Sequence, residues 1–300
     1  MTRRFSWLPM IVGLLVLAGL TGCPDDPYKA DTWTKKLGES REAEQAVTKL
    51  EELGDPSAIG ALGQAWVAQG KPVRLLQVII SLARPLTVED AKKKFVTDYE
   101  ATGRAANWDK ALPFLKQALS EVDEANPRSV DSATKAADAL GEAKLPDGLD
   151  ALIEFAQKPM TKKLVTAQVA AVRAIGKYTE ESAKAASALT KLVDRDPPPH
   201  PRTAKDKDQG RALEEKYSMF VGLTGAAINA LGDLHVASSA KTLVLAMFRT
   251  PDLFLQIRRA LVASGPVAAD ELRKVLAGTH PEVNQLFKDK KLDKYCGDKN

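Results

Sequence analysis

The chain of 300 residues is poor in the side chains that bind metals and perform catalysis. It contains three histidines and two cysteines. None of the histidines has a spacing that suits a zinc site, and the sequence lacks an HExxH helix, a Walker loop, a dinucleotide-binding glycine pattern and a Gly-x-Ser-x-Gly elbow. Carboxylates are plentiful, but they fall on expected solvent faces and helix starts. The sequence therefore predicts no catalytic residue, no metal site and no cofactor.

Aromatic residues and charge of one sign are also scarce. Aromatics make up 6% of the chain, and the abundance of Ala, Leu, Val and Lys is typical of a helical protein rather than a sandwich or barrel. Basic residues number 43 and acidic residues 39, and removal of Arg3 and Arg4 leaves 41 basic residues. No block of five like charges stands out as a nucleic-acid-binding tail. We therefore expect no binding to DNA or RNA.

Only the amino end carries a long apolar run. Arg3 and Arg4 precede a run of about thirteen apolar residues that ends at Leu20, which is too short for a membrane span and typical of a secretory signal. The sequence Leu20-Thr21-Gly22-Cys23 resembles the lipobox of bacterial lipoproteins at all four positions. This resemblance implies cleavage after Gly22 and attachment of a diacylglycerol thioether and an amide-linked acyl chain to Cys23. The alternative is an uncleaved anchor with Cys23 as an incidental thiol.

The lipobox resemblance implies a location. Each buried methylene contributes about 0.8 kcal/mol, so two or three acyl chains make release from the membrane negligible. We expect a signal peptide at 1–22, a flexible tether at 23–37, and a body held in the periplasm or at the cell surface of a bacterial envelope. The residues after Cys23 do not indicate whether the lipid anchor lies in the inner or the outer membrane. Cys296 then has no intramolecular partner, so no disulfide staples the fold.

Pairs of amphipathic helices are predicted from 38 to 280. Apolar helices repeatedly end in a small residue, as in Leu53-Gly54-Asp55, and each such glycine is interpreted as a helix stop. The step of 35 residues from Gly141 to Gly176, and that of 33 from Gly232 to Gly265, are near helical-repeat periods. Six units are predicted, at 38–68, 72–120, 128–157, 163–193, 218–248 and 253–277.

The repeated pattern of a helix, Leu-Gly-Asp or its variant, and a second helix resembles HEAT-type repeats. Armadillo and TPR repeats are the rivals, but the TPR aromatic signature is absent and each unit offers two helices rather than three. The resemblance implies an all-α, right-handed solenoid of about six helix pairs whose neighbours share a continuous core. Residues 281–300 are expected to form an amphipathic cap, with Leu286 and Phe287 on its buried face, or to begin a further repeat.

Two insertions interrupt the repeats, at 84–106 and 194–216. The first is predicted to hold an extra helix, Val88 to Glu100, with a lysine face. The second contains a proline run, which excludes regular helix, and then a short helix from Gln209 to Tyr217. The proline run is either a solvated loop or a stiff extended ligand for an aromatic groove.

Repeated helix pairs without a catalytic motif predict a scaffold that presents its second helices to one or more unidentified envelope proteins. The alternative function is an enzyme or cofactor-maturation factor whose site lies in the concave groove and uses His235 or acidic residues. For the two aromatic candidates among the contact residues, burial in the core is the favoured interpretation. The candidate contact residues are Trp66, Phe155, Pro197, Pro198, Pro199 and His200.

Overall fold

The computed structural model describes residues 26–39, 41–86 and 106–289, and this part of the chain is all-α, with fourteen α-helices and no β-strand. No helix within these ranges has the length and hydropathy that a membrane span requires. The α-helices are α2 (Ala30–Lys36), α3 (Ala43–Leu53), α4 (Ile59–Ala68), α5 (Val73–Ala83), α7 (Trp108–Ser120), α8 (Pro127–Ala143), α9 (Pro146–Gln157), α10 (Val165–Ile175), α11 (Ser182–Val193), α12 (Lys207–Leu234), α13 (Ala240–Arg249), α14 (Phe254–Ala263), α15 (Pro266–Leu276) and α16 (Pro281–Asp289). Four short 3-10 turns accompany them: η1 (Pro56–Ala58), η2 (Pro201–Thr203), η3 (Ala237–Ser239) and η4 (Pro251–Leu253).

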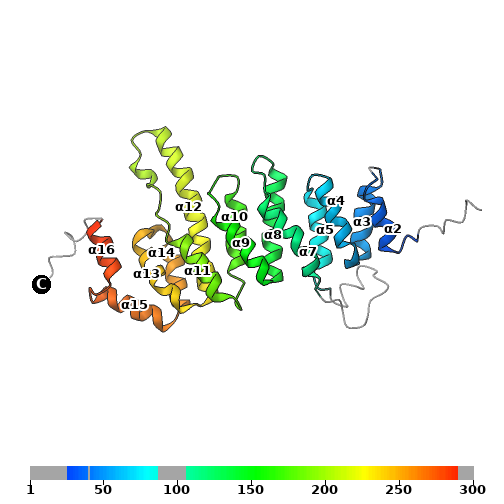
Figure 1. The fold of residues 1–300 in the computed structure, drawn as a ribbon. Coiled ribbons are helices and arrows are strands. Elements are labelled where there is room, and N and C mark those ends of the chain that lie inside the picture. Colours follow the sequence, from blue (N-terminus) through cyan, green and yellow to red (C-terminus); the bar gives the residue numbers. More distant parts are fainter. Residues whose placement is uncertain (1–25, 40, 87–105, 290–300) are drawn as a thin grey trace, which may run out of the picture.

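The helices follow one another in a row from α2 to α16 (Figure 1). Two layers are defined by their contacts. In the first layer α3, α5, α8, α10, α12 and α14 each contact the next, and in the second layer α4, α7, α9, α11 and α13 do the same. Each of the first five predicted units contains one helix of each layer. The sixth contains α14 and α15, both of which contact α13.

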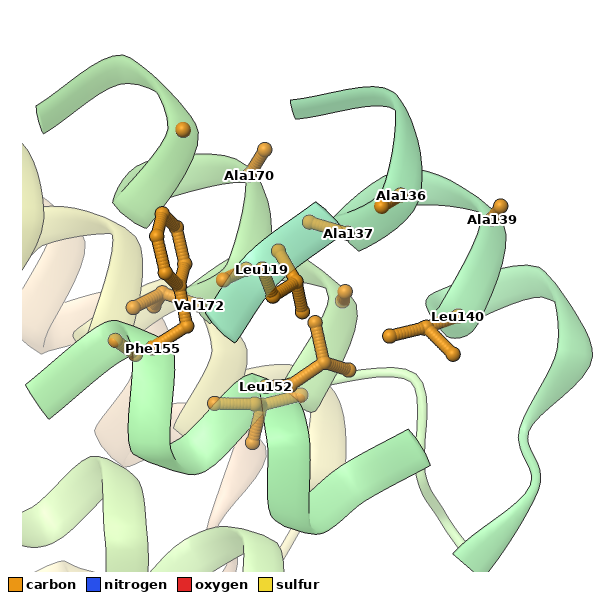
Figure 2. Packing of buried hydrophobic residues seen from close by; sticks show 14 of the residues in the cluster. Leu119, Ala136, Ala137, Ala139, Leu140, Leu152, Phe155, Ala170 and Val172 are labelled. Carbon is orange, nitrogen blue, oxygen red and sulfur yellow. The ribbon is translucent and has the colours of Figure 1, made fainter. Parts of the chain in front are cut away.

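One continuous hydrophobic core lies between the layers. Apolar side chains recur at three and four residues along each helix, so each helix has one apolar face, which it buries against the opposite layer. Figure 2 shows the core around Leu119, Leu140, Leu152 and Phe155, to which α7, α8 and α9 contribute. Alanines such as Ala137 fill the narrower gaps. Because no single helix pair encloses its apolar faces, neighbouring pairs stabilise one another.

The predicted role of the repeated glycines as helix stops is confirmed at Gly54 and Gly176 and wrong at Gly141 and Gly232. Gly54 ends α3 with φ 67, a left-handed conformation that favours glycine. In contrast, α8 continues past Gly141 and α12 past Gly232. These two helices end at Lys144 and His235, which themselves adopt φ 52. Gly141 and Gly232 are therefore not needed as helix stops.

Close packing between neighbouring helices explains these glycines. A Cβ on Gly141 would lie 2.8 Å from the Cβ of Ala174 on α10, closer than real side chains approach. Gly176 lies against Ala230 at the same 2.8 Å, and Gly232 lies against Ala260, whose Cα would be 3.1 Å from the added Cβ. We call these three pairs the glycine–alanine contacts. They let the helix backbones approach closely.

Two segments are more helical than the sequence predicts. Helix α2 occupies 30–36 within the expected tether, and it is held by Trp33, which is buried and donates from Nε1 to the Pro27 carbonyl at 2.8 Å. The expected short helix at 209–217 is instead the start of α12, a single helix of 28 residues that rises above its neighbours in Figure 1. The carboxylate of Asp206 caps it by accepting from the Gln209 N–H at 2.8 Å, and no proline interrupts the helix.

The carboxyl end of the described chain packs back onto the row. Val283 of α16 is buried, and the ring of Phe287 meets that of Phe248 on α13 edge to face at 5.2 Å between centroids. Leu286 is half-buried. Helix α16 thus occupies the first part of the range 281–300, for which a cap or a further repeat is expected. The remaining residues of that range, 290–300, and most of the first insertion, 87–105, lie outside the described residues.

Polar links join the carboxyl ends of neighbouring second-layer helices. A side chain after one helix reaches the end of the preceding helix in that layer, where cations complement the negative end of the helix dipole. The Lys158 ammonium, for example, donates to the carbonyls of Leu119 and Ser120 at 3.2 Å. The other links within this layer are Lys71 to Glu121, Arg195 to the Gln157 carbonyl at 3.4 Å, and Arg249 to Asp194 at 3.3 Å. Gln69, just after α4, extends the row to the end of α2 by donating to the Leu37 carbonyl at 3.0 Å. We call this row the second-layer ladder.

Candidate functional site

The proline-rich segment is fastened to the fold at His200. The ring of His200 lies against that of Tyr217 on α12, with centroids 4.8 Å apart. The Tyr217 hydroxyl donates to Asp252 Oδ2 at 2.7 Å, and His200 Nε2 lies 3.6 Å from the same oxygen. Burial, and then the hydrogen bond to Asp252, raise the pKa of Tyr217 to about 12. The segment is therefore held between α12 and η4.

The environment of His200 does not favour a role as a general base. Its Nδ1 accepts from the Arg202 backbone N–H at 3.1 Å, so Nε2 carries the proton and faces Asp252. Neither ring nitrogen then offers a free lone pair. Of the other three candidates in this segment, Pro197 and Pro198 are half-buried and Pro199 is exposed.

The two aromatic candidates lie in the core. Trp66 is 0% exposed and Phe155 is 1% exposed, so neither side chain forms part of the surface. Each has a cation over its ring. Lys71 Nζ lies 5.7 Å from the Trp66 centroid, and Lys158 Nζ lies 5.4 Å from that of Phe155. Both lysines belong to the second-layer ladder.

The three histidines lie in three separate places. His235 is the residue that ends α12, and its Nδ1 lies 3.1 Å from the Ala263 carbonyl at the end of α14, so this nitrogen is the donor. His280 is 1% exposed and lies between Glu271, at 3.3 Å, and Glu282, at 3.4 Å. In the part of the chain that the structure describes, no three His, Cys, Asp or Glu residues are grouped as a metal site would require.

Two hollows lie over the first layer and together form what we call the first-layer groove. One, of about 560 Å³, lies over α10, α12 and α14. The other, of about 500 Å³, lies over α3, α5 and α8 and reaches Lys177, just after α10. Lys177 lines both hollows. The groove therefore follows several consecutive units, on the layer opposite to the second helices that the sequence favoured as the contact surface.

The two hollows differ in charge pairing. In the second hollow Arg74 pairs with Glu51, and Arg84 makes a bidentate contact to Glu142 at 2.8 and 2.9 Å. The first has a floor of small residues from α12, and Arg173, Lys177 and Asp233 lie beside it. Among the described residues, neither Arg173 nor Lys177 forms an ion pair. The hollow over α10 and α12 thus has cations free to bind a ligand.

The groove residues were not predicted from the sequence. Arg173 and Lys177 are four residues apart, so they share one face of the helix and its end. In the sequence they are indistinguishable from other solvated charges. Only the small residues Gly222, Gly225 and Ala226 mark a face of α12 that leaves space above it.

The lipid-attachment candidate Cys23 and the cleavage site after Gly22 lie outside the described residues. The chain matches no protein-family model and no curated protein sequence.

Proposed function

We propose that this protein is a lipoprotein of the bacterial cell envelope that acts as a scaffold for protein–protein interaction. In this proposal Cys23 carries the lipid and holds the body at the inner or outer membrane. The support for the anchor is the match of Leu20-Thr21-Gly22-Cys23 to all four lipobox positions after a short apolar run. Lipid attachment also fits a described body whose helices do not cross a membrane.

We further propose that the body is a right-handed solenoid of HEAT-like helix pairs. Two observations support this finer description. Consecutive helices alternate between two layers, and the glycine–alanine contacts repeat the same packing at successive steps of the first layer. Such arrays present extended surfaces because each unit contacts only its neighbours.

The observation that carries the scaffold proposal is the first-layer groove. It is lined by residues of α3, α5, α8, α10, α12 and α14, which come from all six units, and includes the cations Arg173 and Lys177. A groove of this extent suits a polypeptide better than a small molecule. The enzyme alternative needs convergent polar groups on one face. The separate positions of the histidines give it less support.

Proximity labelling in the native envelope tests the scaffold proposal. We expect the wild-type protein to label a specific partner. The variant Arg173→Glu/Lys177→Glu should lose that labelling, because it reverses the two positive charges of the groove that form no ion pair within the described residues. The matched control is Lys116→Glu/Lys191→Glu, which reverses two exposed lysines on the second-layer helices α7 and α11. If the groove variant and the control label the same proteins as the wild type, the groove is not the binding surface.

A further inference from the structure

Helix α14 ends the first layer, and its outer face is open. Ala260 packs on Gly232 of α12. On an α-helix the positions opposite Ala260 are Leu255, Arg258 and Val262, because successive residues turn by about 100°. Leu255 is 64% exposed and Val262 is 76% exposed. We call these three residues, with the adjacent Phe254 and Arg259, the α14 outer face.

The sequence of α14 departs from the pattern of the preceding helices at this face. Toward the end of α8, α10 and α12, a glycine stands two residues after an alanine, and the next first-layer helix packs against that glycine. In α14 the corresponding residue is Val262, whose side chain prevents the same close approach. The next helix, α15, contacts α13 of the second layer instead. No described helix covers the position at which a further first-layer helix would lie.

The α14 outer face combines apolar and cationic side chains. Phe254 is 45% exposed, so three large apolar residues of one short helix face solvent. Arg258 and Arg259 lie among them and form no ion pair or hydrogen bond within the described residues. Contiguous exposed apolar surface marks an interaction site, and arginine is frequent where binding energy is concentrated. The complementary ligand therefore carries both apolar and acidic side chains.

The geometry favours a helix as this ligand. Each earlier first-layer helix is covered at the same position by a helix, and packed helices lie 8–10 Å apart when larger side chains meet. A second copy of α14 is disfavoured, because a two-fold axis through the centre of the face would bring Arg258 and Arg259 against the same residues of the partner. An acidic helix instead pairs with both arginines.

We propose that the α14 outer face binds an acidic amphipathic helix of a partner protein. This inference rests on the proposed function as a scaffold, but it assigns a second surface, separate from the first-layer groove. The partner helix packs large apolar residues on Phe254, Leu255 and Val262 and directs carboxylates to Arg258 and Arg259. Binding weakens as salt is added, because the charge pairs lie at an open edge.

Fluorescence anisotropy with synthetic peptides tests the proposal on the full-length protein in nanodiscs of neutral lipid. The probe is a helical peptide about five turns long, with leucines on one face and glutamates beside them. A matched peptide has lysine at every glutamate position. We expect the glutamate peptide to bind and the lysine peptide not to bind. Arg258→Glu/Arg259→Glu should weaken binding of the glutamate peptide about tenfold or more.

The control variant is Arg211→Glu/Lys216→Glu, which reverses two exposed cations on the projecting part of α12 and should bind the glutamate peptide like the wild type. The groove variant Arg173→Glu/Lys177→Glu should also bind it normally, so failure of this inference is distinguishable from failure of the proposed function. Equal binding of both peptides, or unchanged binding by Arg258→Glu/Arg259→Glu, overturns the inference. It is also overturned if the face instead mediates self-association in ultracentrifugation, or binds anionic vesicles but neither peptide.

Discussion

Replacing Gly141 with alanine should destabilise the protein, although alanine is the better helix former. The substitution gains up to about 1 kcal/mol of helix propensity, because Gly141 lies within α8. The new Cβ would lie 2.8 Å from the Cβ and 2.9 Å from the Cα of Ala174. Backbone must then move, and overpacking of this kind costs about 1–3 kcal/mol. The net loss is on the order of 1 kcal/mol.

Gly222 provides a matched control for this substitution. It also lies within a helix, α12, but it is exposed and a Cβ there would meet nothing within 4 Å. Gly222→Ala should therefore gain stability by up to about 1 kcal/mol. For a protein of this size, each kcal/mol shifts Tm by about 2–4 °C.

Thermal and urea unfolding followed by far-ultraviolet circular dichroism measures the contrast between the two variants. We expect the Tm of Gly141→Ala to fall below that of the wild type and the Tm of Gly222→Ala to match or exceed it. If Gly141→Ala is as stable as Gly222→Ala, the glycine–alanine contacts do not set the spacing of the helices, and the packing explanation of the repeated glycines is refuted.

Three further predictions concern other parts of the chain. Tyr217→Phe should lower the free energy of unfolding by about 1 kcal/mol at neutral pH, because the bond to Asp252 is lost. The pKa of Tyr217 in the folded protein is raised to about 12, so the extra stability of the wild type over this variant should be complete below pH 10 and should decline between about pH 10 and 12. Urea midpoints measured across this pH range test the prediction. A stability difference that does not change with pH contradicts it. Lys158→Ala removes two hydrogen bonds at the end of α7 and should cost about 1 kcal/mol, whereas Lys163→Ala at an exposed site should change little; equal Tm values would show that the ladder adds no stability. Cys23→Ala should release the protein from membranes in fractionation, and continued membrane association would contradict lipid attachment at this residue.

The helical content could be predicted from the sequence, because it depends on local apolar periodicity. Each of the six predicted units spans two of the described α-helices. The role of each glycine could not be read in the same way. Gly54 and Gly141 stand in the same Leu-Gly context, yet one ends a helix and the other makes room for Ala174. Only the partner in the next unit distinguishes these roles.

The binding surfaces depend even more on tertiary structure. Trp66 and Phe155 are contact candidates by residue type, but core burial is the favoured interpretation, and both side chains are buried. Whether Arg173 and Lys177 form ion pairs depends on which side chains lie opposite them, and these come from helices far apart in the sequence. For α14, the sequence did contain a signal: Val262 stands where the preceding helices have glycine. That signal becomes visible once the glycine–alanine contacts are known.

The second-layer ladder has a consequence for how disturbances travel through the molecule. Helix ends normally fray independently, but here an end that opens removes a hydrogen-bonding partner from its neighbour. At Lys158, one ammonium group serves two carbonyls of α7 while its own backbone ends α9. Amide hydrogen exchange at the carboxyl ends of these helices should therefore be correlated from one helix to the next, so that opening of one end raises the exchange rate at the end linked to it.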